Sequence, residues 1–180
     1  MASASATSNL PVCPTRIEVG SEAGFRDMLG HFASGVVVVT AFHQGEPVGI
    51  TCQSFSSLSL DPPLVLFCVA RSSRTWPRLR AAGHLAVNIL HEGQEHVGQA
   101  FGRSSADKFA GVQWTAAPGG APHLDAALGW IDCTLEDVHD GGDHLIAVAR
   151  VHAGAVGVVG GPLVYFRGRY ERLGVAAGGR

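Results

Sequence analysis

Charged residues are scarce in this chain of 180 residues, and the two signs are almost balanced. Lys, Arg, Asp and Glu together make up 16% of the residues, and the formal net charge is −2. Proteins that bind nucleic acid through its phosphates carry a basic patch or an excess of positive charge. The composition therefore gives no indication of a nucleic-acid-binding protein.

Long hydrophobic runs are absent as well. No stretch reaches the 18 or more uncharged apolar residues that a membrane-spanning helix needs, although 46% of the residues are hydrophobic. Residues 1–20 are rich in Ala, Ser, Thr and Pro, but they lack the basic start and apolar core of a signal peptide. We expect a disordered tail over 1–20, one domain over 21–175, and a cytoplasmic protein.

Two common cofactor motifs are missing. The four cysteines, Cys13, Cys52, Cys68 and Cys133, form no Cys-x-x-Cys pair, so neither a zinc site nor a dithiol redox centre is indicated, and reduced thiols are the simplest account. The run Gly154–Gly161 is rich in glycine, but it lacks the helix and acidic residue that follow the glycines of a dinucleotide fold. It is predicted to be a flexible connection between strands.

Hydrophobic periodicity predicts many strands and few helices. Ser21–Ala33 reads as an amphipathic helix capped by Ser21, whose apolar residues Phe25, Met28, Leu29 and Phe32 should cover one end of a barrel. Further helices are predicted over Thr75–Ala82 and Gly93–Gly102. Strands are predicted over Val36–Phe42, Val48–Leu58, Leu64–Val69, His84–Leu90, Ile131–Leu135, Leu145–Val151 and Leu163–Arg172.

The predicted connections between these strands are short, and one strand is apolar without interruption. Gln44–Pro47 reads as a hairpin turn, and Pro118–Pro122 and His139–Asp143 read as loops. Leu64–Val69 is apolar throughout, so we expect it to be buried on both faces. Short turns and many strands favour a mainly β fold, a closed or nearly closed antiparallel barrel with a few helices.

A polar segment carries most of the chemical information. Thr51–Ser57 presents hydroxyl and amide side chains without a carboxylate, and Arg71–Thr75 adds two cations and three hydroxyls after the apolar strand. Neutral donors suit the carbonyls and nitrogens of a heteroaromatic ring, and arginines among hydroxyls suit a phosphate. The same residues also fit an edge strand with a polar face and a basic surface loop.

Several segments from Phe25 to Tyr170 resemble the flavin reductase-like family, the split-barrel reductase components of two-component flavin-dependent monooxygenases. The most specific is Ser57-Leu58-Ser59-Leu60-Asp61-Pro62-Pro63-Leu64-Val65. The others are Gly35–Thr40, Pro47–Phe55, Asp107–Phe109, Gly142–His144 and Leu163–Tyr170. The resemblance implies a split-barrel flavin-binding fold and an NAD(P)H:flavin oxidoreductase that uses FMN or FAD with NADH or NADPH and serves an oxygenase partner.

The resemblance also implies where the cofactors bind. The expected contacts are Pro47, Val48, Gly49, Ile50, Thr51, Cys52, Gln53, Ser54, Cys68, Ser72, Ser73, Arg74, Phe101, Gly102, Lys108, Asp143 and His144. Ser72, Ser73 and Arg74 would hold the flavin phosphate, although spacing alone does not say whether Arg71 or Arg74 faces inward. Cys52 is interpreted as a backbone contact and not as a nucleophile.

The resemblance further implies that His144 is the catalytic residue, in contact with the nicotinamide nucleotide and oriented by Asp143. The neighbouring His139 and Asp140 leave a divalent metal site as an alternative, and the paired glycines alternatively fit a tight turn. Lys108 faces either a phosphate or the reduced ring, or belongs to an exposed ion pair. No metal is expected.

Two other functions stay open at this stage. One is an enzyme of the same fold that retains its flavin and oxidises an organic substrate itself, and the other is a non-catalytic flavin- or haem-binding protein. Split barrels of this family pair so that each flavin site is completed by the other subunit. We therefore expect a homodimer.

Overall fold

The computed structural model of the chain describes residues 20–104 and 107–173. The expected tail at 1–20 and Cys13 therefore lie outside the described residues, apart from Gly20. The elements in chain order are α1 (Glu22–Gly30), β1 (Ser34–Gly35), β2 (Val37–His43), β3 (Glu46–Cys52), β4 (Ser56–Leu60), β5 (Pro63–Ala70), α2 (Trp76–Ala82), β6 (His84–Ile89), α3 (Glu95–Gly102), β7 (Trp114–Ala116), β8 (Pro122–Leu124), β9 (Gly129–Gly141), β10 (His144–Val156), β11 (Leu163–Phe166) and β12 (Arg169–Arg172).

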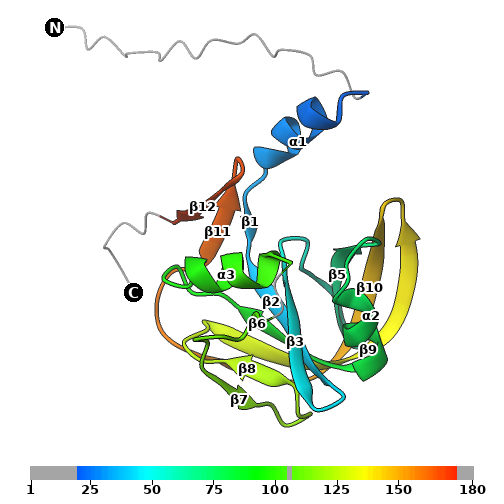
Figure 1. The fold of residues 1–180 in the computed structure, drawn as a ribbon, viewed down its shortest axis with the longest axis vertical. Coiled ribbons are helices and arrows are strands. Elements are labelled where there is room, and N and C mark those ends of the chain that lie inside the picture. The colour runs from blue at the N-terminus through cyan, green and yellow to red at the C-terminus, as the bar shows by residue number, and fades with distance from the viewer. Residues whose placement is uncertain (1–19, 105–106, 174–180) are drawn as a thin grey trace, which may run out of the picture.

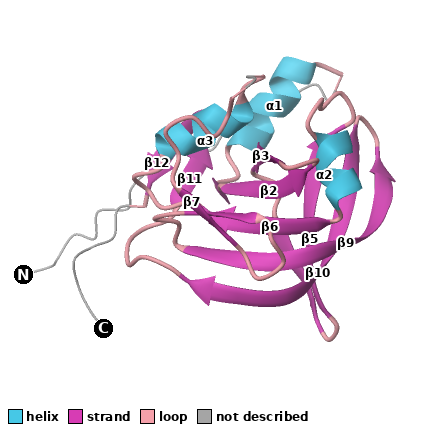
Figure 2. Ribbon diagram, turned by 60° about the horizontal axis from the view of Figure 1, so that its bottom comes forward, coloured by secondary structure: helices cyan, strands magenta, loops and turns pink. Residues whose placement is uncertain are grey.

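One curved antiparallel sheet forms the body of the molecule (Figure 2). Its strand order is β3-β2-β6-β9-β10-β5-β4, and the long β9–β10 hairpin is its largest pair. Two small sheets, β1-β11-β12 and β7-β8, lie beside it. The mainly β fold predicted from the sequence is confirmed. No helix among the described residues is long and apolar enough to cross a membrane.

The inside of the curved sheet is filled by aliphatic and aromatic side chains. Phe67 of β5 and Leu85 of β6 are fully buried, and α2 adds Trp76 and Leu79 from one end. Each such side chain contributes about 1.5–3 kcal/mol by leaving water. The helix α2 therefore closes the barrel and also fixes the loop that precedes it, Arg71–Thr75.

The chain changes edges of the sheet between β3 and β4. The predicted strand Val48–Leu58 is broken at Gln53, because β3 pairs with β2 at one edge and β4 pairs with β5 at the other. Residues Gln53–Phe55 carry the chain across the gap. This crossing brings the polar segment that starts at Thr51 next to β5.

The prediction that Leu64–Val69 is buried on both faces is wrong. In β5 the burial alternates, with Val65, Phe67 and Val69 in the barrel core and Leu66 and Cys68 only half-buried on the other face. An apolar run is also compatible with a strand whose second face borders a cleft. In β5, Cys68 lies on this second face and lines a cleft on the surface of the protein.

The first helix begins where the sequence predicts. The Ser21 hydroxyl accepts a hydrogen bond from the Gly24 amide at 3.2 Å, which caps α1. No residue of α1 is buried, however, and Phe25 and Phe32 are 41% and 80% exposed. The expectation that this apolar face covers an end of the barrel is wrong within one chain, since α1 stands away from the barrel (Figure 1).

Several boundaries also differ from the sequence prediction. The predicted last strand is a hairpin, because the chain reverses between β11 and β12 through Arg167 and Gly168, which have φ angles of 49° and 78°. Most of the predicted loop at His139–Asp143 belongs to β9, so only its end forms the turn into β10. Pro122 begins β8, and β10 continues into the predicted connection as far as Val156.

Candidate functional site

A cleft of about 1140 Å³ opens where β3, β5, α3 and the loop before α2 meet. It brings together most of the predicted site residues: Ile50, Thr51, Cys52, Gln53, Ser54, Cys68, Ser72, Ser73, Arg74, Phe101, Gly102, Lys108 and His144. Pro47, Val48 and Gly49 instead line a second cavity of about 300 Å³. Asp143 lies beside the main cleft, where it contacts His144.

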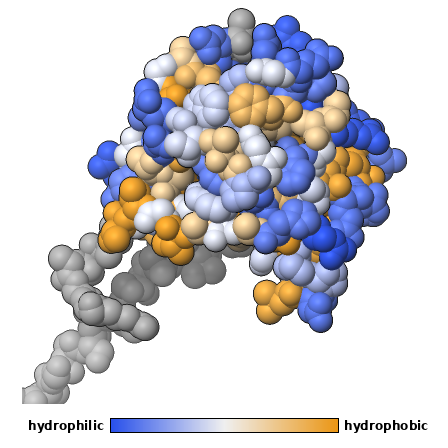
Figure 3. All heavy atoms as spheres, turned by 90° about the horizontal axis from the view of Figure 1, so that it is seen from below, coloured by the Kyte–Doolittle hydropathy of each residue, from blue (hydrophilic) through white to orange (hydrophobic). Residues whose placement is uncertain are grey.

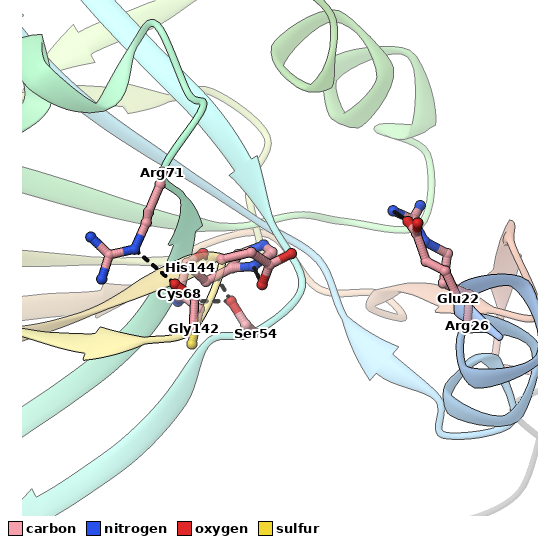
Figure 4. A network of polar contacts seen from close by, with 8 residues as sticks. Glu22, Arg26, Ser54, Cys68, Arg71, Gly142 and His144 are labelled. Atoms are coloured by element: carbon pink, nitrogen blue, oxygen red, sulfur yellow. Dashed lines mark hydrogen bonds and ion pairs between the residues drawn. The ribbon is translucent and has the colours of Figure 1, made fainter. Parts of the chain in front are cut away.

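Hydroxyl groups tie the walls of the main cleft together. The Ser54 hydroxyl donates to the Cys68 carbonyl at 3.1 Å and accepts from the Cys68 amide at 2.8 Å, which fixes the crossing segment against β5 (Figure 4). The Thr51 hydroxyl donates to the Gly98 carbonyl of α3 at 2.7 Å. The hydroxyls of Ser54 and Thr51 therefore hold the walls of the cleft in place.

The Cys52 thiol is buried and chemically quiet. Burial, with a smaller contribution from Cys68, raises the pKa of Cys52 to about 12. The thiol is therefore neutral at physiological pH, whereas a nucleophilic cysteine needs its thiolate. Cys52 lies at the end of β3, beside the cleft. Its backbone, and not its thiol, is therefore the part that can contact a ligand.

The two arginines of the loop before α2 have different surroundings. Arg71 donates from Nε to the Gly142 carbonyl at 2.8 Å (Figure 4). It also forms an ion pair with Asp140, so it holds the loop against the β9–β10 turn. Arg74 lines the main cleft. The Ser73 hydroxyl accepts a hydrogen bond from the Trp76 amide at 3.2 Å, and no side-chain cap bond is made by Thr75.

Lys108 connects three parts of the site. Its ammonium group donates to the carbonyls of Gly49 and Phe101 at 3.1 and 2.9 Å and lies 3.5 Å from the Thr75 hydroxyl. Burial lowers the pKa of this half-buried lysine. Asp107 instead accepts from the Phe109 amide. The alternative of an exposed Asp-Lys ion pair is therefore wrong.

His144 begins β10 opposite Ala70, at the edge of the cleft. Its Nδ1 lies 2.8 Å from Asp143 Oδ1, and the hydrogen bond with His144 holds the pKa of Asp143 below its usual range. His139 lies 3.3 Å from Asp137 instead. Among the described residues, no three His, Cys, Asp or Glu side chains are arranged to hold a metal ion.

Several residues that line the main cleft were not among those predicted from the sequence. They are Leu29, Val69, Ala70, Arg78 and Ser104. Leu29 was predicted to pack against the barrel, Val69 ended the strand predicted to be fully buried, and Ala70 lies just beyond that predicted strand. Arg78 had a usable signal, because it is a further cation in α2, directly after the loop that carries Arg71 and Arg74.

The family comparison agrees with this geometry, since residues 29–174 match the flavin reductase like domain. The chain belongs to this family. Flavin reduction is therefore the activity to which the cleft must be related.

Relatives with known roles cover most of the chain. It is 47% identical over 149 residues to the reductase subunit HsaB of a flavin-dependent monooxygenase from Rhodococcus jostii, covering 83% of this chain and 76% of that protein. The reductase component of 4-nitrophenol 4-monooxygenase/4-nitrocatechol 2-monooxygenase from Rhodococcus opacus is 42% identical, with coverages of 83% and 80%.

Solved structures show the same fold. The NADH:FAD oxidoreductase SgcE6 of Streptomyces globisporus C-1027, in complex with NAD and FAD fragments, has a TM-score of 0.86 and 32% identity, covering 92% of this chain and all of that one. Nitrilotriacetate monooxygenase component B from Mycobacterium thermoresistibile has a TM-score of 0.82 and 46% identity, with coverages of 88% and 92%. The resemblance to flavin reductases is thus confirmed.

Proposed function

We propose that this protein is an NAD(P)H:flavin oxidoreductase that transfers hydride from NADH or NADPH to FMN or FAD and supplies the reduced flavin to a separate monooxygenase. The observation that carries the proposal is the main cleft, in which neutral polar groups, the loop with Arg74, and His144 surround one space of about 1140 Å³. Ligand pockets commonly enclose about 300–1,000 Å³. The cleft is therefore large enough for two stacked ring systems.

The donor set fits a flavin. The backbone of Thr51–Ser54 and the Gln53 amide offer neutral hydrogen-bonding groups without a competing charge, as a heteroaromatic ring requires. Ser72, Ser73 and Arg74 offer two hydroxyls and a guanidinium for the phosphate. Lys108 adds positive charge near the cleft, which favours the negative charge of a reduced ring.

When both cofactors are bound, they supply the hydride chemistry themselves. The tasks of the protein are to hold the two rings about 3–3.5 Å apart and to exclude water. We assign the reception of the nicotinamide nucleotide to His144, whose orientation is set by its contact with Asp143 at 2.8 Å. No acid–base triad is required.

We also propose a homodimer and a cytoplasmic location. The apolar side chains of α1 are exposed in the single chain, and one of them, Leu29, lines the main cleft. A second copy placed on α1 would bury this face and complete the wall of the cleft. Cys52, Cys68 and Cys133 are free thiols, which suits a reducing compartment.

The function is tested by following the loss of NADH and of NADPH with added FMN or FAD. We expect oxidation of at least one nucleotide that depends on added flavin. A protein that binds flavin but oxidises neither nucleotide would contradict the proposal, and so would one that consumes an organic substrate without an oxygenase.

His144→Ala tests the assignment of the nicotinamide contact. The loss of one hydrogen-bonding group should cost about 0.5–1.5 kcal/mol of transition-state stabilisation. This corresponds to a fall in kcat/KM for the nucleotide of roughly twofold to tenfold, with nearly unchanged flavin affinity. Anaerobic stopped-flow reduction of the flavin-loaded variant measures this change. His139→Ala is the matched control, because His139 lies on the same hairpin beside Asp137. Weakened flavin binding with an unaltered reduction rate would refute the assignment.

A further inference from the structure

Arg71 contacts the turn between β9 and β10 at three points. Its backbone amide donates to the Asp143 carbonyl at 3.0 Å, and its Nε donates to the Gly142 carbonyl at 2.8 Å (Figure 4). Its guanidinium also forms an ion pair with Asp140. The backbone contact lies directly after the last residue pair between β5 and β10. One residue at the end of β5 therefore holds this turn through both its backbone and its side chain.

The side-chain contacts of Arg71 contribute little to the stability of the fold. The side chains of Arg71 and Asp140 are 46% and 86% exposed, and exposed ion pairs stabilise proteins only weakly. The turn contains two glycines, and Gly142 has a φ angle of 75° with open space where a Cβ would lie. Glycines allow many backbone conformations. The contacts of Arg71 therefore act mainly on the conformation of the turn.

The turn leads into Asp143 and His144 at the edge of the main cleft. The Asp143 side chain is 93% exposed, and its Oδ1 lies 2.8 Å from Nδ1 of His144. A carboxylate beside one ring nitrogen sets the tautomer and the direction of an imidazole. Because little protein packs around the Asp143 side chain, its direction depends on the backbone of the turn. The direction of the His144 ring is therefore coupled to Arg71.

We propose that Arg71 is a positioning residue for His144. The inference rests on the proposed function, in which His144 receives the nicotinamide nucleotide. Arg71 does not line the main cleft, so it acts through the turn and not on a bound ligand. The next three residues, Ser72–Arg74, are assigned to the flavin phosphate. One short segment thus serves the contacts to both cofactors.

The first test observes the His144 ring without any cofactor, in a proton–carbon correlation spectrum of the full chain with labelled histidines. His144→Ala identifies the ring signal by its loss. Arg71→Ala should shift this signal by more than its linewidth, because the turn loses both side-chain contacts. Arg150→Ala is the matched control, since Arg150 pairs with Glu136 at 2.7 Å on the same hairpin, away from the turn, and should leave the signal in place. An unmoved signal in Arg71→Ala would overturn the inference.

The second test measures kinetics at saturating flavin. Arg71→Ala should lower kcat/KM for the nucleotide that the enzyme oxidises by roughly twofold to tenfold, the range expected for His144→Ala. In the His144→Ala background, Arg71→Ala should change kcat/KM by less than about twofold, because the ring through which it acts is gone. Additive losses in the double variant would overturn the inference.

Two further measurements separate positioning from other roles of Arg71. The melting temperature of Arg71→Ala should lie within about 4 °C of that of the unaltered protein, because the ion pair is exposed. A larger fall would mean that Arg71 supports the fold as a whole. FMN and riboflavin affinities should change by the same factor. Selective weakening of FMN would make Arg71 a phosphate ligand and would also overturn the inference.

The proposed function fails in a different way. If the unaltered protein oxidises neither nucleotide with any flavin, the function falls, while the His144 signal still decides whether Arg71 positions the ring. If flavin is reduced and the signal does not move in Arg71→Ala, the function stands and only the role of Arg71 is rejected.

Discussion

At the scale of single residues, the two arginines of one short loop have separate tasks. Arg71 is held by Gly142 and Asp140 on the neighbouring hairpin, and Arg74 faces the main cleft. The sequence shows two cations in this loop, but it does not show which of them faces the cleft. The division matters for function, because only the cation at the cleft can contact a bound phosphate.

Arg74→Ala should weaken FMN much more than riboflavin, since only FMN carries the phosphate. The loss of one charge-assisted hydrogen bond corresponds to about 1.5–3 kcal/mol, or roughly tenfold to a hundredfold in affinity. Fluorescence titration of both flavins measures the difference. Arg71→Ala is the comparison variant, and it should affect both flavins alike through the loop. Equal losses for FMN and riboflavin in Arg74→Ala would show that Arg74 acts only on structure.

The thiols Cys52 and Cys133 give a second residue-scale prediction, on pH dependence. Burial raises the pKa of each from about 9 to about 12. The stability contributed by the neutral thiols is therefore fully present below about pH 9 and is lost as the pH rises toward 12. Between pH 8 and pH 10 the free energy of unfolding should fall by roughly 1 kcal/mol per thiol.

Urea unfolding at these two pH values measures that loss. The variant Cys52→Ala/Cys133→Ala is less stable at pH 8, because methyl-sized side chains leave space in the core. Its stability should nevertheless decline less between pH 8 and pH 10 than that of the unaltered chain. An identical decline in both proteins would mean that other groups, such as tyrosines and lysines, account for the pH dependence.

At the scale of elements, one side chain joins three of them. Lys108 bonds β3 through Gly49 and α3 through Phe101, and it approaches Thr75 at the start of α2. Together with β5, these parts of the chain line the main cleft. The shape of the site therefore depends on a half-buried ammonium group as well as on the barrel core.

Lys108→Met should lower the free energy of unfolding by about 1–3 kcal/mol, because two carbonyls lose a charged donor and the methionine keeps most of the apolar stem. Thermal unfolding measures the loss. If Lys108 positions the walls, FMN and riboflavin should be weakened by similar factors, which distinguishes this variant from Arg74→Ala. Weakening of FMN alone, with unaltered stability, would make Lys108 a phosphate ligand instead.

At the scale of the whole molecule, the surface of the single chain is uneven. On the face shown in Figure 3, hydrophobic side chains form separate groups among hydrophilic ones. The helix α1 differs, since Phe25, Met28, Leu29 and Phe32 are all exposed along nine residues and the turn that follows. An amphipathic helix with an uncovered apolar face is typical of an interface.

The homodimer proposal predicts about twice the chain mass of 18.7 kDa in light scattering at micromolar concentration. Phe32→Asp should shift the protein toward the monomer, because it places a charge on the apolar face of α1. Val159→Asp is the control, since Val159 is also exposed but lies in the connection after β10. A monomer mass for the unaltered chain would contradict the proposal.

Local patterns in the sequence were sufficient for much of the fold and for part of the site. Ser21 as a helix cap, the hairpin of β2 and β3, and most strands depend on neighbouring residues and on hydrophobic periodicity, which can be seen without tertiary contacts. The motif around Ser57–Val65 was specific enough to indicate the family. Most residues expected at the cofactors also share one cleft.

Only the tertiary structure decided the remainder, because it depends on contacts between distant parts of the chain. The crossing at Gln53 follows from which strands pair at the two edges of the sheet, and the orientation of Arg71 depends on a hairpin far along the sequence. The partners of Lys108 come from three separate elements. Likewise, the amphipathic pattern of α1 indicates an apolar face, but it carries no information on whether that face meets the barrel of its own chain.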